Sequence, residues 1–276
     1  MTSVLGAGAL AKMTSTLQEP IAYELPLGAE SVPVNALLGQ AVQLRFLGAI
    51  HCNHCGRKTK KSFSQGYCYP CFRSLAQCDL CIMSPERCHY DAGTCREPEW
   101  GESFCMTDHI VYLANSSAAK VGITRVNQVP TRWIDQGAVS ALPIFRVATR
   151  QQSGLVEDCL REHIADKTNW RNMLKGITTD IDLTALATEL TDKCAPGITG
   201  LQERFGVQAI QRLASAEVQS LAYPVLEYPE KVKTHNFDKT PLVEGTLQGI
   251  KGQYWILDTG VINIRKFTGY QVELAA

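Results

Sequence analysis

Hydrophobic and polar positions divide this chain into stretches of different character. Near the N-terminus, Tyr23–Pro26 alternates and Val42–Leu47 runs apolar between turn residues, which is typical of β-strands. The C-terminal stretch has the same kind of pattern in Val243–Ile250, Tyr254–Leu257 and Val261–Ile264. A faint similarity between the two stretches leads us to expect that they pair as one barrel-like β unit.

The middle of the chain has the pattern of a hairpin followed by helices. Ile110–Ala114 and Lys120–Thr124 are short apolar runs on either side of a polar Asn-Ser-Ser turn, and they predict a β-hairpin. Ser153 is a candidate N-cap for a helix with an apolar stripe at helical period. Residues 181–193 and about 200–220 predict two further helices, separated by a Cys-Ala-Pro-Gly break.

Between the N-terminal stretch and the hairpin lies a segment without a periodic apolar face. It is rich in Gly, Pro, Ser and charged residues, so it cannot form a core by itself and needs a covalent or metal staple. The patterns together predict an α+β fold. Its five segments are an N-terminal β segment (1–50), a cysteine-rich module (51–108), a small α/β core (109–176), a helical segment (177–222) and a C-terminal β segment (223–276).

Composition narrows the class of protein. The 276 residues include 27 Lys+Arg and 27 Asp+Glu, which excludes a uniformly cationic protein but allows a local cationic face. A hydrophobic fraction of 45% is enough for a sizeable core and argues against disorder. No stretch approaches the ~20 apolar residues that cross a bilayer, so we expect no membrane partner. The start of the chain lacks the basic opening of a secretory signal, and we expect a cytoplasmic protein.

Cysteine usage indicates metal binding. Of the 11 cysteines, nine lie between Cys52 and Cys105, and only Cys159 and Cys194 lie outside. An odd count without an export signal is unlike a disulfide framework, because thiols in a reducing compartment stay unpaired. Clustered thiols in such a compartment are typical of a metal site.

Two C-x-x-C pairs predict a first zinc site. Cys52 and Cys55 form one pair, and Cys68 and Cys71 form the other, with twelve residues between the pairs. Two such turns supply the four thiolates of a tetrahedral zinc shell, and an all-thiolate shell is typical of a structural ion. Redox pairs are the alternative, but they usually occur singly beside a βαβ pattern.

A second set of thiols predicts a second structural zinc ion. One C-x-x-C pair is followed by three further cysteines, which exceeds the four ligands of a tetrahedral site. The ligand choice therefore stays open. We favour Cys78, Cys81, Cys88 and Cys95, with Cys105 as an alternate ligand or a buried thiol.

Basic and aromatic residues near the cysteines indicate contact with nucleic acid. Basic residues lie between the first two thiol pairs, with no acidic residue from Cys52 to Arg73, and cations on a rigid loop suit phosphate groups. A merely solvated charged loop is the alternative. A second basic and aromatic patch follows the predicted hairpin, where a core role for the tryptophan is the other reading. The nucleic-acid-binding candidates are Arg57, Lys58, Lys60, Lys61, Arg73, Arg125 and Trp133.

Motifs along most of the chain resemble a known family. They include Cys68-Tyr-Pro-Cys71-Phe, Lys120-Val-Gly-Ile-Thr-Arg and Gly249-Ile-Lys-Gly-Gln-Tyr. The chain is similar in these motifs to an uncharacterised bacterial family, the domain of unknown function 2797. This resemblance implies no function.

Residues 109–175 also resemble the GIY-YIG nuclease superfamily. Tyr112 lies in the first predicted strand, and Lys120 takes the place of the second tyrosine, as in a phage-associated branch of that superfamily. The resemblance implies that Tyr112 orients or deprotonates a water, that Arg132 stabilises the phosphate and that Glu157 holds one Mg²⁺. Lys120 can act on phosphate as a point charge. The sequence departs from the pattern in lacking a histidine four residues after Arg132.

These observations support three functional hypotheses. The first is a zinc-stapled protein that binds DNA or RNA through a module preceding a GIY-YIG-like α/β core, which hydrolyses phosphodiesters with Mg²⁺. The second is a non-catalytic zinc module that binds RNA or protein and uses the same core as a scaffold. The third is redox sensing through the surplus thiols Cys105, Cys159 and Cys194.

Overall fold

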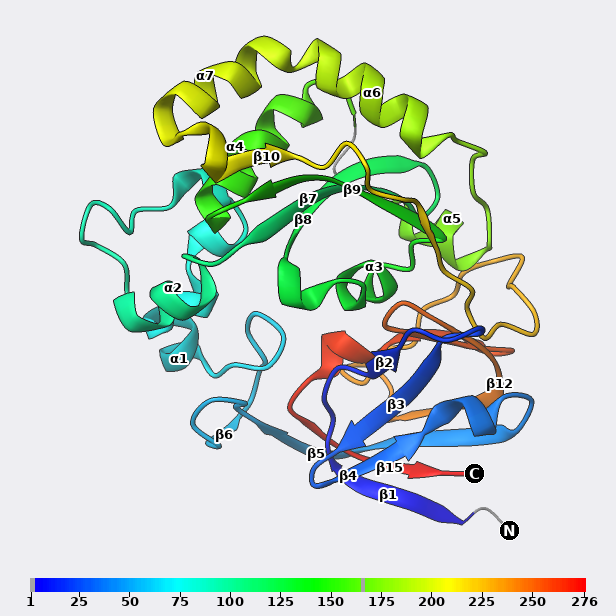
Figure 1. The fold of residues 1–276 in the computed structure, drawn as a ribbon. Coiled ribbons are helices and arrows are strands. Elements are labelled where there is room, and N and C mark those ends of the chain that lie inside the picture. Colours follow the sequence, from blue (N-terminus) through cyan, green and yellow to red (C-terminus); the bar gives the residue numbers. More distant parts are fainter. Residues whose placement is uncertain (1–2, 165–166) are drawn as a thin grey trace.

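The first and last parts of the chain share one β-sheet (Figure 1). The computed structural model describes residues 3–164 and 167–276; the first two residues of the predicted N-terminal segment and residues 165 and 166 of the predicted core lie outside these ranges. The strand order is β1-β15-β5-β12-β13-β14, with β6 paired to β5, and all pairings are antiparallel. The bounds are β1 (Val4–Ala9), β5 (Ala41–His51), β6 (Lys58–Thr59), β12 (Leu242–Lys251), β13 (Tyr254–Leu257), β14 (Gly260–Asn263) and β15 (Tyr270–Ala275).

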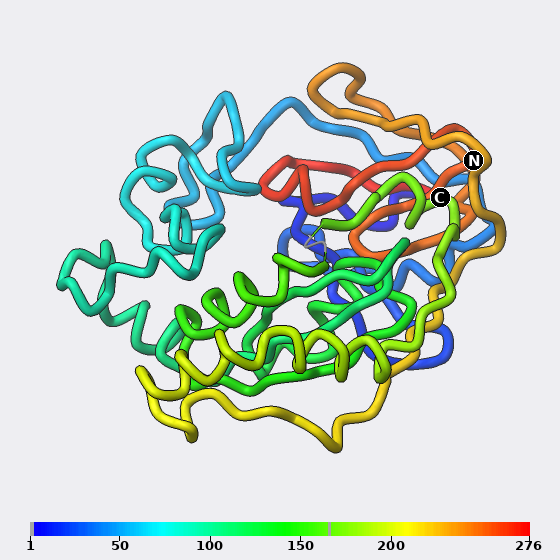
Figure 2. The backbone as a smooth tube through the Cα atoms, turned by 90° about the horizontal axis from the view of Figure 1, so that it is seen from above, coloured from blue at the N-terminus to red at the C-terminus, as the bar shows by residue number. Residues whose placement is uncertain are grey.

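Strand pairing brings the two ends of the chain close together, as Figure 2 shows. The backbone N–H of Ser3 donates to the carbonyl of Ala276 at 2.7 Å, and β15 lies between β1 and β5. Pairing of the N- and C-terminal β segments is therefore seen directly in the strand order. The division of the chain at residues 50, 108, 176 and 222 stays a prediction.

Both halves of this β unit contain the same succession of elements. A hairpin is followed by a 3₁₀ helix and then a strand, in β3–β4–η1–β5 and in β13–β14–η7–β15. In each half a glycine with positive φ follows the 3₁₀ helix, 77° at Gly39 and 89° at Gly269, a conformation that glycine adopts readily. β3 and β4 form a three-stranded sheet with β2. The bounds are β2 (Thr14–Thr16), β3 (Ala22–Leu27), β4 (Glu30–Pro33), η1 (Val34–Leu37) and η7 (Ile264–Phe267).

A second, smaller sheet carries the predicted hairpin. Its order is β10-β9-β7-β8, with β11 paired to β9, and β7 pairs with β8 so that Tyr112 lies opposite Gly122. The hairpin prediction is confirmed, because its apolar runs form two neighbouring antiparallel strands. The bounds are β7 (His109–Asn115), β8 (Ala119–Arg125), β9 (Ser140–Val147), β10 (Ile210–Arg212) and β11 (Gln219–Ser220).

Helices lie on both sides of the smaller sheet (Figure 1). On one side α4, α6 and α7 bury residues such as Val156, Leu190 and Ile198 in a core shared with β7 and β9. On the other side α3 lies between the sheet and β2. The bounds are α3 (Thr131–Asp135), α4 (Arg150–Arg161), α5 (Trp170–Leu174), α6 (Leu183–Lys193) and α7 (Ala195–Phe205), with α1 (Tyr69–Ser74) and α2 (Pro98–Phe104) in the cysteine-rich module.

Polar contacts fasten α3 to the terminal β unit. Lys12 Nζ lies 2.5 Å from the Asp135 carboxylate, and the Gln253 amide donates to the same side chain at 2.9 Å. The Tyr223 hydroxyl donates to the carbonyl of Ala138 at 2.7 Å. These contacts fix the orientation of the helix that carries Arg132.

Helix boundaries differ from the predictions at two places. Helix α4 begins at Arg150 rather than after Ser153, because Thr149 and Gln152 form a capping box that satisfies free N–H groups one turn earlier. The predicted helix over 200–220 is wrong beyond Phe205, where Gly206 has φ 93° and the chain turns into β10 and β11. The Cys-Ala-Pro-Gly break instead opens α7, since proline is tolerated in the first helical turn.

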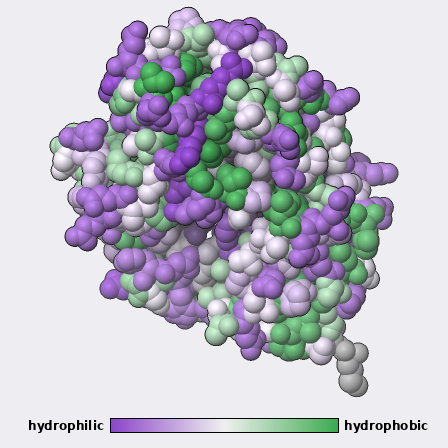
Figure 3. Space-filling view, viewed as in Figure 1, coloured by the Kyte–Doolittle hydropathy of each residue, from purple (hydrophilic) through white to green (hydrophobic). Residues whose placement is uncertain are grey.

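The surface mixes apolar and polar residues. On the face in Figure 3, hydrophobic residues form several groups among hydrophilic ones. None of the helices in the described ranges combines the length and the apolar character needed to cross a membrane.

Truncation of a buried aromatic ring in η7 tests the shared core. Phe267 is 1% exposed and packs against Phe237 and Tyr270. We expect Phe267→Ala to lower the free energy of unfolding by about 3–5 kcal/mol, because it leaves a cavity. The control Leu47→Ala removes a side chain that is 50% exposed and should cost less than about 0.5 kcal/mol. Denaturant unfolding measures both, and equal losses would contradict the assignment of the core.

Candidate metal centre and polar cluster

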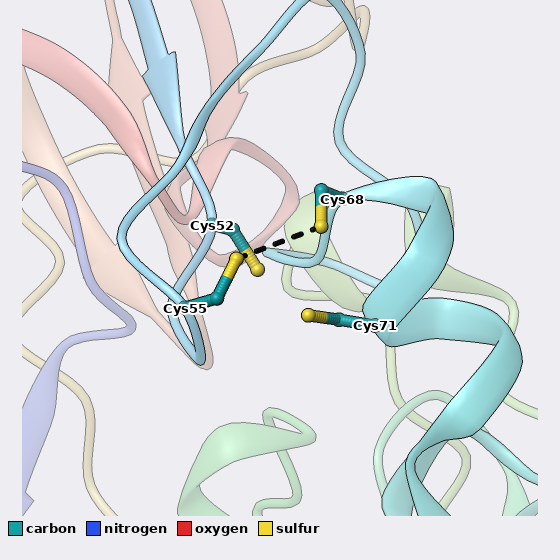
Figure 4. Close-up of side chains that lie close together, drawn as sticks. All are labelled: Cys52, Cys55, Cys68 and Cys71. Atoms are coloured by element: carbon teal, nitrogen blue, oxygen red, sulfur yellow. Dashed lines mark hydrogen bonds between the residues drawn. The ribbon is translucent and has the colours of Figure 1, made fainter.

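Four thiols from two turns meet at one point (Figure 4). Cys52 follows β5 and Cys55 lies in the next turn, whereas Cys68 precedes α1 and Cys71 lies in its first turn. Their sulfur atoms all lie within 4.8 Å of one another, and the Cys55 and Cys68 sulfurs are 3.7 Å apart. The two predicted C-x-x-C pairs are therefore brought together.

The sulfur spacing fits a tetrahedral zinc ion. Zn–S bonds of about 2.3 Å place sulfurs roughly 3.8 Å apart, close to the separation of Cys55 and Cys68. Burial and neighbouring thiols raise the pKa of Cys71. Burial also acts to raise the pKa of Cys52, but hydrogen bonds from backbone N–H groups outweigh it and lower this pKa to about 6. A divalent cation stabilises all four thiolates at once, so this cluster could hold a metal such as zinc.

The second predicted set of thiols is not brought together as expected. Cys78 packs against the buried cluster of Cys52, Cys68, Cys71 and Leu75 at the first site. Its three predicted partners instead line a cavity of about 20 Å³ together with Cys105, and this cavity does not include Cys78. The difference arises because Cys78 ends the short η2 helix (Ala76–Cys78), which places it on the side of the first cluster.

A group of mixed ligands lies at the edge of the same cavity. One ligand atom each of Asp79, Cys81 and His89 lies within 4.8 Å of the others. Asp79 is already engaged, because Arg96 Nε lies 2.8 Å from its carboxylate and the N–H of Leu80 donates to it at 2.6 Å.

Tyr112 forms the centre of a polar cluster beneath the hairpin. Its side chain is fully buried, and its hydroxyl donates to the Gln136 amide oxygen at 2.9 Å. The positive charge of Arg132 acts on the same hydroxyl. A Cβ atom at Gly122 would lie 2.8 Å from the Tyr112 ring, so only glycine lets the ring pack on β8. The ring also contacts Trp133, with centroids 5.8 Å apart.

Several charges act on this cluster. Burial raises the pKa of Tyr112 to about 12, with the charge of Arg132 opposing and that of Glu157 assisting the shift. Arg150 is close to both Arg132 and Glu157, and burial lowers its pKa. Lys120 is buried on β8 in the same hairpin. The predicted residues Tyr112, Arg132 and Glu157 therefore come within electrostatic reach of one another.

The predicted nucleic-acid contacts divide into two groups. The basic residues of the loop between the thiol pairs are exposed, and these are Arg57, Lys58, Lys60 and Lys61. Arg73 is exposed as well. Trp133 is only 3% exposed and packs on Tyr112, so it is a core residue and the expectation of base stacking is wrong. Arg125 is half-buried, with its guanidinium 3.6 Å from the centre of the Phe104 ring.

Three residues of the cluster were not predicted. Gln136 accepts a hydrogen bond from the Tyr112 hydroxyl. Its position one helical turn after Arg132 is the sequence feature that could have predicted this role. Arg150 and Arg265 are brought near Arg132 by tertiary contacts. No local pattern marks these two residues, because they lie on different elements, α4 and η7.

A comparison with family models places the chain among known proteins. The family described as Protein of unknown function (DUF2797) matches residues 39–272. The chain belongs to this family. The matched part of the DUF2797 chain includes both cysteine sets, the hairpin and β12–β14, but not β1–β4. Searches of curated proteins and of solved structures find no match.

Loss of the first metal centre should destabilise the cysteine-rich module. We expect Cys55→Ser to lower the zinc content by about one ion per chain, because it removes one of four ligands. A strong chelator should remove folding free energy on the order of 10 kcal/mol per structural ion. Elemental analysis and circular dichroism measure these effects, with Cys159→Ser on α4 as the control that keeps its zinc. A metal-free protein that stays folded in chelator would contradict the assignment.

Proposed function

We propose that this DUF2797 protein is a zinc-stabilised nucleic-acid-binding protein that hydrolyses phosphodiesters at the Tyr112 cluster. The observation that carries the proposal is that a hydroxyl on β7, a guanidinium on α3 and a carboxylate on α4 lie within electrostatic reach of one another. A phosphodiester needs a cation to offset the charge of its transition state and a group that positions water. Arg132 and Tyr112 have these chemical properties.

The resemblance to GIY-YIG nucleases supports the same roles. Tyr112 would orient the attacking water, Arg132 would bind the phosphate, and Lys120 would add positive charge. Because burial raises the pKa of Tyr112 to about 12, its hydroxyl stays protonated near neutral pH and acts by orientation rather than as a base. Gln136 stands four residues after Arg132, where the superfamily pattern has a histidine, and it accepts a hydrogen bond from the Tyr112 hydroxyl.

Glu157 is the residue proposed to hold Mg²⁺. Magnesium usually keeps several waters and is bound by one or two carboxylates together with substrate phosphates, so a single glutamate fits. The bound ion would supply Lewis acidity at the phosphate. Glu157 is half-buried on α4 and is not enclosed in the core.

The cysteine-rich module is proposed to supply the nucleic-acid contacts and two structural zinc ions. A zinc-stapled loop holds exposed cations in a fixed arrangement, which suits a phosphate backbone. Arg57, Lys58, Lys60 and Lys61 are these cations, and Arg73 on α1 is a further one.

One observation favours the non-catalytic alternative. The Tyr112 side chain is completely buried, and its hydroxyl already donates to the Gln136 side chain, as expected of a residue that stabilises a scaffold. In that case the chain would bind RNA or protein through the zinc module without cleaving it. The cleavage experiment separates the two functions.

Removal of the exposed cations tests nucleic-acid binding. In Arg57→Ala/Lys58→Ala/Lys60→Ala/Lys61→Ala we expect weaker binding to single- and double-stranded oligonucleotides. The slope of log affinity against log salt should fall by about 0.7–0.9 for each lost phosphate contact. The control Lys231→Ala/Lys233→Ala/Lys239→Ala removes exposed lysines near the C-terminal sheet and should leave the slope unchanged. Fluorescence anisotropy at several salt concentrations measures both, and equal slopes in all proteins would exclude this surface.

Substitution of Glu157 tests cleavage. With Mg²⁺ present, Glu157→Gln should lower the rate of oligonucleotide cleavage by about 100-fold or more while binding persists, because a metal ligand is lost. The control Asp158→Asn changes the neighbouring carboxylate, which pairs with Arg161 at 2.5 Å, and should retain cleavage.

Substitution of Tyr112 tests the role of its hydroxyl. Tyr112→Phe should lower the cleavage rate by the same factor at every pH between about 6 and 9, because the hydroxyl does not titrate in this range. Binding without cleavage by the unmodified protein would support the scaffold function.

A further inference from the structure

Four of the thiols outside the first cluster line a separate cavity, and these are Cys81, Cys88, Cys95 and Cys105. Cys105 stands here in the place of Cys78, which was expected from the spacing along the chain. No three of these four sulfur atoms lie within 4.8 Å of one another, so binding of one ion would draw them closer together. The cavity volume of about 20 Å³ matches a space for one water or ion, which requires at least roughly 10–15 Å³. An organic ligand is too large for it. A small, thiol-lined space in a segment with few apolar residues is suited to a metal ion.

We propose that Cys81, Cys88, Cys95 and Cys105 bind the second zinc ion in this cavity and that this ion holds the first turn of α4 in place. The assignment of the ligands depends on the cavity and not on the proposed activity. The consequence for catalysis rests on the proposed function, because it concerns the helix that carries Glu157. Binding releases the thiol protons, as for other zinc thiolate sites.

The ends of short helices supply the thiols. Cys81 lies in η3 (Leu80–Ile82), Cys88 follows η4 (Pro85–Arg87), and Cys105 follows α2. At Gly101 on α2 a Cβ atom would lie 3.5 Å from the Cys95 sulfur and 3.2 Å from the Tyr90 ring, so glycine lets α2 lie directly against the cavity. The chain segment from 81 to 105 thus closes around this point.

The nearby oxygen and nitrogen ligands have other partners. Asp79 pairs with Arg96 and also caps η3, as described above. His89 Nδ1 lies 2.8 Å from the Thr94 hydroxyl, and its Nε2 lies 3.4 Å from the Asp79 carboxylate. An acidic group near zinc thiolates can orient a ligand without coordinating the ion. Once drawn together by an ion, the four thiols would complete a tetrahedral shell without either residue.

Direct hydrogen bonds connect the ligand loops to α4. The backbone N–H of Arg150 donates to the carbonyl of Cys105 at 2.8 Å, and the Gln151 amide donates to the carbonyl of Cys88 at 3.2 Å. Arg150 Nη2 also donates to the carbonyl of Ile82, next to Cys81, at 2.6 Å. Three of the four ligands are thereby joined to the first turn of α4.

Close packing continues this connection one turn further along the helix. A Cβ atom at Gly154 would lie 2.7 Å from the backbone nitrogen of Glu86, so the η4 backbone lies directly on α4. Glu157 is on the next turn of the same helix, and Arg150 lies near its charge. An ion that fixes the loops therefore also fixes the position of the helix that presents this carboxylate.

Two matched cysteine variants test the ligand set. We expect Cys105→Ser to lower the zinc content from about two ions to about one per chain, and Cys78→Ser to leave it at about two. Zinc is counted by elemental analysis on the full chain purified without chelator. Cobalt exchanged for zinc should give the absorption of two tetrahedral thiolate sites in Cys78→Ser and of one in Cys105→Ser. Loss of an ion in Cys78→Ser with retention in Cys105→Ser would overturn the assignment.

Amide hydrogen exchange tests the connection to α4. In Cys105→Ser, protection of the amides of residues 150–157 should fall, whereas protection in α6 should be unchanged; in Cys78→Ser both should resemble the unmodified protein. Retained α6 protection also shows that Cys105→Ser is folded. Where this variant does not fold, Cys88→Ser is measured in the same way. Loss of the ion without a change in α4 protection would overturn the coupling, and neither result depends on whether the protein cleaves nucleic acid.

Discussion

The meeting of four cysteine thiols at one point is the constraint on which the middle of this protein depends. The cysteine-rich module has helices of only a few residues, and the buried core at its first cluster consists of Cys52, Cys68, Cys71 and Leu75. Such a core buries too little apolar surface to offset the conformational entropy of ordering the loops. A metal ion such as zinc, held by the four thiols of the first cluster, would supply the missing free energy at the position where β5 leaves the sheet.

The terminal β unit acts as the frame for the remaining elements. Its contacts with Asp135 and Ala138 orient α3, so Arg132 is positioned by connecting segments from both ends of the chain. The cysteine-rich module positions α4 from the other side. The Tyr112 cluster therefore lies where two separately stabilised parts of the molecule meet, and its geometry depends on both of them.

The sequence was sufficient where the signal is local. The hairpin of β7 and β8 follows from two apolar runs and a polar turn, and the first metal centre follows from the spacing of two thiol pairs. The apolar stripe predicts a start of α4 that is too late, because the capping box at Thr149 satisfies free N–H groups one turn earlier. The end of α7 was placed too late as well, because Gly206 stops the helix whereas composition alone suggested that it continues.

The sequence was insufficient where tertiary contacts decide. Trp133 resembles an exposed aromatic in its local context, but α3 turns it into the core against Tyr112. Cys78 and Cys105 could not be distinguished by spacing, since only the fold of the module puts them at different sites. Arg150 and Arg265 reach Arg132 from distant elements, which no periodic pattern records.

The pairing of β5 with β12 and β15 has a consequence for biosynthesis. β5 is made early, but its two neighbours in the sheet are separated from it by about two hundred residues. The nascent chain must therefore carry an incomplete apolar surface while the intervening elements emerge from the ribosome. The thiol pairs that directly follow β5 need no distant partner, so metal can be captured before the large sheet is completed.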